Sequence, residues 1–312
     1  MNEPMSSAMK ARLTDGRWHF QHGPIDLVIA ADGDREACEA ALDACWTAFL
    51  NVLPELANEL RQLRQPVNNA ARFSGPVAVR MLNACAPFAR TRFITAMAAV
   101  AGAVADHLIQ CFKRPGVDRA SINNGGDIAI HLAPRSSYRV GVVADIDWVA
   151  RSGSPHVELD GTIELLASSP IRGIATSGWR GRSFSLGIAD SVTVLAQNGA
   201  AADAAATLIA NAVNVDSSGI RRARAIDLDP NTDLGDRLVT VEVPQLAAGL
   251  VGSALDAGRQ EAEHWRGFGL IHSAVLFLQD QIEIVAPTDA RPAVASFFKQ
   301  PGSNSCSASA AS

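Results

Sequence analysis

One segment, a short apolar strand followed by a helix built almost entirely of small residues, constrains the fold more than any other. The predicted strand covers residues 191–196, a turn follows at 197–199, and residues 200–214 are nearly all alanine and aliphatic. Side chains four residues apart lie on one face of an α-helix. Asp203 and Thr207 are therefore expected to project together from this helix, and the search for a functional site begins with them.

A second helix of small residues is predicted within residues 93–113. Its central positions carry alanine or glycine: Ala96, Ala98, Ala99, Ala101, Gly102, Ala103 and Ala105. Such a helix lets its backbone approach another backbone or a ligand closely. Tight core packing and ligand contact are both consistent with this composition, and the pattern alone does not choose between them.

Predicted strands and further helices surround these two segments. Paired strands form a hairpin near each end of the chain, at 17–21 with 25–31 and at 268–278 with 281–285. Further strands are expected at 119–122, 128–132, 138–145, 157–166, 171–177 and 238–243. Further helices are expected from Asp34 to a break at Pro54, and at 55–64, 77–88 and 245–265. Strands interrupted by long helices, with hairpins at both ends, predict an α+β fold with mixed or antiparallel sheets.

Length and composition set the domain organisation. A chain of 312 residues can bury a full core, so we predict a single domain over residues 1–300. Two intimately packed lobes, about 1–115 and 116–300, are the alternative. Residues 301–312 are serine- and alanine-rich without aromatic anchors, which predicts a disordered tail.

Charge and cysteine content narrow the class of protein. The formal net charge of −5 gives no electrostatic reason to expect nucleic acid, and the apolar run 94–105 is too short to span a membrane. The five cysteines form no CxxC pair and lack the density of a disulfide scaffold, so they fit a reducing compartment. Residues 1–18 contain no apolar signal-peptide core, and the expected location is therefore the cytoplasm.

Common catalytic motifs are missing from the sequence. There is no GxGxxG after a strand, no GxxxxGK[ST], no HExxH and no GxSxG, and the seven histidines show no i, i+4 pair. Asp203 and Thr207 remain as two oxygen ligands of the kind that Mg²⁺ prefers. The alternative is structural: an aspartate favoured by the positive end of its own helix, and a threonine bonded back to a main-chain carbonyl.

A polar, glycine-rich segment at 123–127 separates two apolar strand segments. Glycines and polar residues inside a strand pattern predict a β-bulge, at which a ligand could lie against the backbone.

Three sequence blocks together resemble the ApbE superfamily, which includes Mg²⁺-dependent FAD:protein FMN transferases. The blocks are Asn-Asn-Gly-Gly-Asp-Ile at 123–128, Gly-Ile-Ala-Thr-Ser-Gly at 173–178, and the strand at 191–196 followed by Ala-Asp-Ala-Ala-Ala-Thr at 202–207. The small-residue helix ending in Gly102 and Asp106 is a weaker fourth block. The four occur in the family's order, and the resemblance implies the family's T-fold-related α+β architecture.

The resemblance also implies roles for individual residues. The aspartate and threonine of the family's DxxxT motif bind the metal together with a main-chain carbonyl, which here gives Asp203, Thr207 and the carbonyl of Ala98. The two glycine-containing blocks line the flavin dinucleotide in the family. Their counterparts in this chain are Asn124, Gly125, Gly126, Asp127, Thr176, Ser177 and Gly178.

The chain also departs from the transferase pattern. Flavin transferases carry a Ser-His and an Asp-Pro-x-Thr-Gly element between the second and third blocks, whereas residues 179–190 here contain neither. Arg180 and Arg182 could replace this element by gripping phosphate, or they could be solvated loop residues. Asp190 could act as a base or cap a turn. The family's helix lysine is Ala101 here, so the chain is most similar to the shortened, uncharacterised branch of the superfamily.

Three functions follow as hypotheses. The first is an ApbE-like enzyme, transferase-like or related, that binds a flavin (FAD or FMN) or a similar phosphorylated heterocycle with Mg²⁺. The second is a noncatalytic ligand-binding or assembly protein on the same scaffold. The third is an enzyme of coenzyme or one-carbon metabolism with a non-flavin substrate. A small phosphorylated ligand is the expected partner, without nucleic acid or membrane, and a protein substrate and a homodimer are left open.

Overall fold

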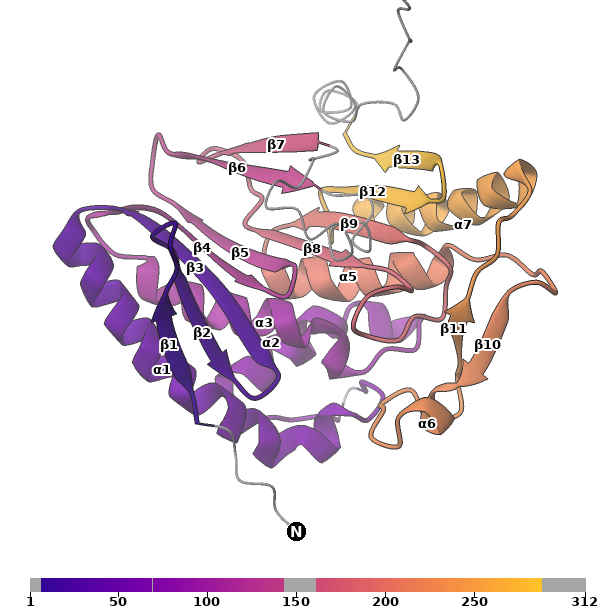
Figure 1. The fold of residues 1–312 in the computed structure, drawn as a ribbon, viewed down its shortest axis with the longest axis horizontal. Coiled ribbons are helices and arrows are strands. Elements are labelled where there is room, and N and C mark those ends of the chain that lie inside the picture. Colours follow the sequence, from indigo (N-terminus) through magenta and orange to yellow (C-terminus); the bar gives the residue numbers. More distant parts are fainter. Residues whose placement is uncertain (1–6, 69, 143–160, 288–312) are drawn as a thin grey trace, which may run out of the picture.

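The fold is organised around one antiparallel sheet of nine strands. The computed structural model describes residues 7–68, 70–142 and 161–287 (Figure 1). Every neighbouring pair in the sheet is antiparallel. Across the sheet, the strands are β1 (Met9–Arg12), β2 (Trp18–His22), β3 (Ile25–Gly33), β4 (Val117–Asn124), β5 (Asp127–Leu132), β8 (Gly173–Ser177), β9 (Ser191–Ala196), β12 (Ser273–Leu278) and β13 (Gln281–Val285). The predicted α+β class and both terminal hairpins are confirmed.

The main helices cover one face of this sheet. They are α1 (Arg35–Leu63), α2 (Pro76–Cys85), α3 (Val100–Leu108), α5 (Gly199–Ala212) and α7 (Ala248–Gly267). Packing follows the strand order, because α1 contacts β3, α3 contacts β4 and β5, α5 contacts β8 and β9, and α7 contacts β12 and β13. Three 3₁₀ helices complete this layer: η1 (Phe88–Arg90), η2 (Ala96–Ala99) and η3 (Ile109–Phe112).

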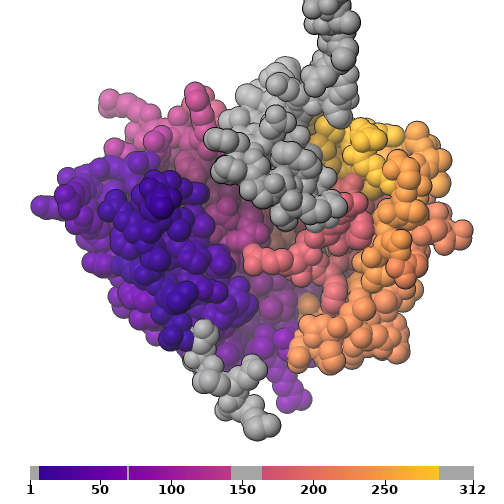
Figure 2. Space-filling view, viewed as in Figure 1, coloured from indigo at the N-terminus to yellow at the C-terminus, as the bar shows by residue number. Residues whose placement is uncertain are grey.

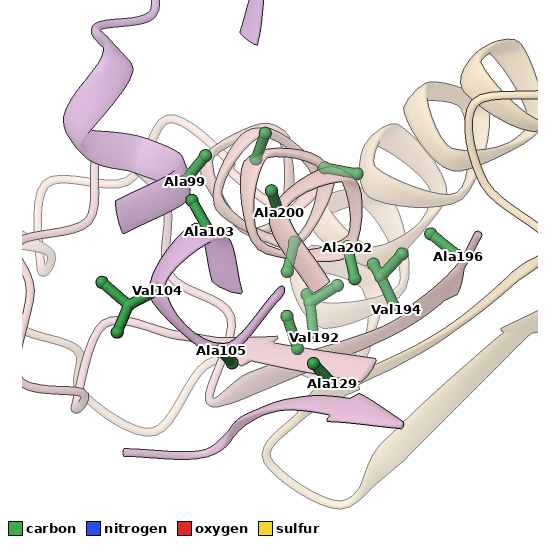
Figure 3. Close-up of a cluster of buried hydrophobic side chains, with 14 of the residues drawn as sticks. Ala99, Ala103, Val104, Ala105, Ala129, Val192, Val194, Ala196, Ala200 and Ala202 are labelled. Carbon is green, nitrogen blue, oxygen red and sulfur yellow. The ribbon is translucent and has the colours of Figure 1, made fainter. Parts of the chain in front are cut away.

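Small side chains fill the space between the helices and the central strands. Figure 3 shows alanines of α3 and α5 beside Val192 and Val194 of β9. Alternate residues of a strand point to opposite faces, and Leu195 belongs to a second apolar cluster on the other face. All six residues of β9 are therefore buried, as expected for a strand covered on both sides.

The second face of the sheet carries a smaller layer. There, β6 (Ser137–Val142) pairs with β7 (Gly161–Leu166) in a separate two-stranded sheet, and Val140 and Leu165 pack in the second apolar cluster. The predicted strands at 138–145 and 157–166 are thus found in part. The remaining residues of the two predicted strands, 143–145 and 157–160, lie outside the described residues, as does the predicted tail 301–312. The domain boundaries stay a prediction.

Two segments of the fold differ from the prediction. Pro54 does not end a helix, because α1 runs unbroken from Arg35 to Leu63. Buried Phe49, Val52 and Leu56 continue one apolar stripe past the proline, and their burial outweighs one missing backbone hydrogen bond. The segment 221–234, for which no strand or helix was predicted, contains β10 (Arg221–Arg224), which pairs with β11 (Leu238–Glu242), and the short helix α6 (Ala225–Leu228).

A buried carboxylate ties α7 to the segment before η2. Glu261 accepts hydrogen bonds from Arg92 Nε at 2.9 Å and Nη2 at 2.7 Å, and from Trp265 Nε1 at 2.9 Å. Charge-assisted, two-pronged pairs of this kind are stronger than neutral hydrogen bonds. Within the described part of the chain, no helix is both long and apolar enough to cross a membrane.

We expect Glu261→Gln to destabilise the protein by about 1–3 kcal/mol, because the amide cannot satisfy both nitrogens of Arg92. Urea unfolding followed by tryptophan fluorescence measures this change. Glu242→Gln is the matched control, since Glu242 pairs with Arg221 at the surface and its loss should change the free energy of unfolding by less than about 1 kcal/mol. Equal losses in the two variants would contradict a special role for Glu261.

Candidate functional site

The helices α3 and α5 cap each other with aspartates. Asp106 of α3 accepts hydrogen bonds from the main-chain N–H groups of Gly199 at 2.9 Å and Ala200 at 2.7 Å, at the start of α5. In return, Asp203 of α5 accepts one from Gly102 N–H, in the first turn of α3, at 3.0 Å. Each carboxylate thus meets the unpaired amides and the positive end of the other helix.

A glycine contact brings the two helices close enough for this exchange. A Cβ atom added to Gly102 would lie 2.3 Å from the carbonyl oxygen of Gly199, closer than non-bonded atoms approach. Only glycine therefore fits at position 102 without a shift of one helix. The close backbone approach allowed by the small-residue composition occurs here, between two helices.

Asp203 combines partial exposure with an unfavourable electrostatic environment. Burial raises the pKa of Asp203 well above its ordinary value, and the charge of Asp127 raises it further, while the N–H groups of Gly102 and Ala101 offset part of the effect. Asp203 does not cap its own helix, because Asn198 does so by accepting from Ala201 N–H at 2.8 Å. The Asp203 carboxylate caps α3, through the hydrogen bond that it accepts from Gly102 N–H.

Thr207 lies one turn further along α5 and is partly exposed. Its hydroxyl forms no hydrogen bond with any other described residue. Elsewhere, Thr47 Oγ1 donates to the carbonyl of Asp43 at 3.0 Å, and Ser253 Oγ donates to that of Gly249 at 2.9 Å. The back-bond to the preceding turn that a helical threonine often makes is thus missing at Thr207, which leaves its oxygen available to a ligand.

Ala98, whose carbonyl is the third predicted metal ligand, belongs to η2. This 3₁₀ helix packs against α5, and Ala98 is partly exposed. The structure therefore brings the three predicted metal-site residues onto two adjoining elements. The nearby Thr95, which the sequence did not single out, is buried and donates its hydroxyl to Asp233, 138 residues away in the sequence.

The glycine-rich block forms a hairpin turn instead of the predicted bulge. Asn124 of β4 pairs with Asp127 of β5, and Gly125 and Gly126 connect them with φ angles of +66° and +115°. Two central residues with positive φ give the tight turn that suits the twist of a hairpin, which explains the two glycines. The bulge prediction failed because the apolar segments on either side belong to two strands. Asn124 Nδ2 donates to the carbonyl of Ala101 at 3.1 Å, so the end of the hairpin is bound to α3.

Asp127 is buried at this turn and titrates near neutrality. Burial raises the pKa of Asp127 to about 7, although the N–H of Thr176 and the charge of Arg182 both lower it. Arg182 lies against the turn, because a Cβ on Gly125 would fall 1.8 Å from its guanidinium nitrogen. Asp127 and Asp203 are close enough to repel each other, and a bound cation or a shared proton would relieve that repulsion.

The Thr-Ser-Gly block divides between the two faces of the sheet. Thr176 Oγ1 lies 2.9 Å from Thr193 Oγ1, and strand alternation places it with Ile174, away from α5. Ser177 shares the helix-covered face with Ala175. Gly178 is explained by packing, since a Cβ there would lie 2.2 Å from the carbonyl oxygen of Asp190. Ser177 is therefore the member of this block best placed to reach the α5 site.

Asp190 fixes the segment that follows β8. Its carboxylate accepts hydrogen bonds from Trp179 Nε1 at 3.1 Å and from Gln279 N–H at 2.5 Å, and Arg180 Nε lies 3.5 Å away. The Arg180 guanidinium also stacks on Trp179, 4.9 Å from the ring centroid. These contacts favour the turn-fixing alternative for Asp190 over its use as a base.

Sequence comparison identifies the family. Residues 10–284 match the sequence model of a family described as "AbpE bacteria". The chain belongs to this family, and the resemblance inferred from the sequence blocks is confirmed. The curated relatives are called UPF0280 proteins, a name that states no activity.

The length of chain that can be aligned differs from one relative to the next. The UPF0280 protein of Methanothrix thermoacetophila is 37% identical over 154 residues, which cover 49% of this chain and 57% of the relative. That of Methanoculleus marisnigri is 33% identical over 211 residues, covering 65% and 78%. The chain spans about half to three fifths of the first relatives that it matches. Among solved structures, the apo form of the Pseudomonas stutzeri flavinyl transferase ApbE is 13% identical over 92% of this chain and 95% of that one, with a TM-score of 0.43.

Gly102→Ala should destabilise the protein by about 1–3 kcal/mol, because the added methyl group collides with Gly199 and separates the two caps. Thermal or urea unfolding measures the change. Gly249→Ala is the control: it also lies in a helix but has nothing within 4 Å of an added Cβ, so about 0.5–1 kcal/mol of stabilisation is expected. A neutral Gly102→Ala would show that the helices are not held at backbone contact.

Asp127→Asn tests whether the pKa of Asp127 is raised, when stability is measured as a function of pH. The pKa of Asp127 is higher in the folded protein, at about 7, than its ordinary 3.8, so the folded state holds the proton more tightly. Stability is therefore lost as the pH rises between these values. In EDTA, the stability of Asp127→Asn relative to wild type should improve by about 1–3 kcal/mol from pH 4.5 to pH 8.

Asp256→Asn provides a control of opposite sign. Hydrogen bonds from Arg259 and Gln260 lower the pKa of Asp256, so its contribution to stability is present at high pH and lost on acidification. A difference between Asp127→Asn and wild type that does not change with pH would exclude a raised pKa at Asp127.

Proposed function

We propose that this chain binds a phosphorylated small molecule together with Mg²⁺ at Asp203, and that it acts as an ApbE-like enzyme on a flavin nucleotide, FAD or FMN. One observation carries the proposal: the half-buried Asp203 carboxylate is repelled by Asp127 and lies one turn from the unbonded hydroxyl of Thr207. A bound cation would reduce the repulsion between Asp203 and Asp127 and would be coordinated by the Thr207 hydroxyl.

The donors present fit a hard cation. Asp203 would supply a carboxylate oxygen, Thr207 its hydroxyl and Ala98 its main-chain carbonyl, all of the oxygen type that Mg²⁺ prefers. Within residues 7–68, 70–142 and 161–287, no three His, Cys, Asp or Glu side chains gather in a metal-binding cluster. So few protein carboxylates favour a cation that completes its shell with water and ligand phosphate oxygens. When bound, the cation would neutralise phosphate charge.

The hairpin turn supports the ligand part of the proposal. Gly126 is exposed and has nothing within 4 Å of an added Cβ, so its backbone is open to a ligand. Arg182 sits beside Gly125 with its guanidinium exposed, where it could pair with a phosphate. Ser177 adds a hydroxyl from the neighbouring strand end.

The transfer reaction has weaker support than binding. The Ser-His and Asp-Pro-x-Thr-Gly elements are missing, and Asp190 is engaged by Trp179, Gln279 and Arg180. These contacts favour a second candidate function, a noncatalytic ligand-binding or assembly protein. The third hypothesis, an enzyme of coenzyme or one-carbon metabolism with a non-flavin substrate, would place its substrate in the same site. Mass spectrometry of small molecules released from the purified protein separates flavin from other ligands.

Asp203→Asn and Thr207→Val should each weaken Mg²⁺-dependent FAD binding by about tenfold or more, because each removes a ligand oxygen or its charge while keeping the side-chain shape. Titration calorimetry with FAD, with Mg²⁺ and with EDTA, measures this.

The matched controls are Asp236→Asn, an exposed loop carboxylate, and Thr47→Val, a helical hydroxyl of α1 that is bonded to its own helix. Both should bind FAD like the wild type. Wild-type protein that shows no saturable FAD binding with Mg²⁺ would remove flavin from the proposal. Unchanged binding in Asp203→Asn would remove the cation site.

A further inference from the structure

A surface hollow of about 570 Å³ lies at the C-terminal end of α1. Its walls are the last turn of α1, Phe93, and the segment 230–237 that joins α6 to β11. In Figure 2 the orange region around α6 lies against the purple region of the N-terminal half. A hollow of this volume is within the range of small-molecule sites, and none of the residues assigned to the α5 site lines it.

The hollow is positively charged although the chain is negative. Three arginines line it, Arg61 in the last turn of α1, Arg64 directly after that helix and Arg237 from the facing segment, against one carboxylate, Asp233. That carboxylate already accepts a hydrogen bond from the Thr95 hydroxyl. The chain carries a formal net charge of −5, so a local excess of positive charge attracts anions to this place.

Two of these guanidinium groups have no charged partner among the described residues. Neither Arg61 nor Arg64 forms an ion pair with another described residue, whereas Arg92, Arg224 and Arg259 all do. Arginine side chains near the end of a helix also interact favourably with its negative end. That effect accounts for two positive residues on α1, but it does not account for Arg237, which reaches the same hollow from a segment distant in sequence.

Arg237 adds a flat surface to the hollow. Its guanidinium carbon lies 3.1 Å from the centroid of the Phe93 ring, so the guanidinium is stacked on the ring. A stacked guanidinium is held in one plane, and its other face can receive a planar ring.

The facing segment is held in place before any ligand binds. Thr232 N–H donates to the carbonyl of Asp229 at 3.0 Å, and Leu234 N–H donates to Thr232 Oγ1 at 3.2 Å. Together with the Thr95 to Asp233 bond, these contacts tie the segment to itself and to the residue before η2. Preorganisation of this kind reduces the entropy lost on binding.

We propose that this hollow is a second ligand site, which binds a small molecule carrying a phosphate group beside a flat ring. Arg61 and Arg64 hold the phosphate, and the Arg237 and Phe93 stack receives the ring. Guanidinium groups match the geometry of phosphate oxygens and bind them with paired hydrogen bonds. The site needs no cation and does not depend on the function proposed for Asp203.

Adenosine monophosphate in EDTA is the probe, because it joins a phosphate to a planar ring and the chelator silences any cation site. Titration calorimetry of the full chain should show saturable binding that is tighter than that of inorganic phosphate or adenosine alone. Arg61→Gln with Arg64→Gln should weaken binding by about tenfold or more. Phe93→Leu should weaken binding of the nucleotide but not of phosphate.

Two controls make the result specific. Arg35→Gln removes the same charge from the other end of α1 and should leave the affinity unchanged. Urea unfolding verifies that the double variant remains folded. No saturable binding of the nucleotide to the wild type would overturn the proposal, and so would an equal loss of affinity in Arg35→Gln, which would indicate attraction by net charge alone.

Discussion

The mutual capping of α3 and α5 is the interaction on which the centre of this protein depends. Both helices are short and consist largely of small residues, so only a few large side chains, such as Leu108 of α3 and Ile209 of α5, anchor them in the core. Asp106 and Asp203 instead tie the start of each helix to the body of the other, across the Gly102 and Gly199 contact. The same contact sets the position of the β4–β5 hairpin, because Asn124 binds the first turn of α3. One pair of helix ends thus fixes the relative positions of the residues assigned to the site.

This arrangement concentrates negative charge in a poorly solvated region. The pKa values of Asp106, Asp127 and Asp203 are all raised, with burial as the main cause in each case. The three carboxylates differ in what surrounds them. Both oxygens of Asp106 are used by amides of α5, and the residue is buried, so its role is structural. Asp203 keeps partial exposure and faces a repelling neighbour, so it can cap a helix and still gain from a cation. A structural role and a binding role are therefore compatible at Asp203.

Much of this architecture follows from local sequence patterns. The parts that do not follow from them have one physical cause in common. Elements that depend on hydrophobic periodicity and on turn residues could be predicted. They are the strand, turn and alanine helix around residue 200, the N-cap at Asp34 and both terminal hairpins. Pro54 and the 125–126 turn were misinterpreted because tertiary burial and strand pairing decided them. The partner of Asp203 lies 101 residues away, and that of Thr95 lies 138 residues away. The residue periodicity of a single helix or strand gives no information about contacts between residues so far apart in the sequence. The sequence blocks predicted which residues form the candidate site, whereas the repulsion between Asp127 and Asp203 could not be predicted from them.

The segment between β8 and β9 is the place where this chain departs from the sequence pattern of the flavin transferases. Flavin transferases carry the Ser-His and Asp-Pro-x-Thr-Gly elements in this segment. In this chain the segment makes structural contacts instead, because Asp190 accepts hydrogen bonds from Trp179 and from Gln279 in the turn between β12 and β13. Gly178 has no room for a side chain, so this end of β8 is packed against the chain itself. The same segment also contacts the candidate site, because Arg182 lies against Gly125 of the hairpin turn and Leu186 N–H donates to Asn211 Oδ1 of α5 at 2.8 Å. The fold alone therefore does not decide the reaction, because a change within one segment between two strands alters the residues beside the candidate site while the scaffold is kept.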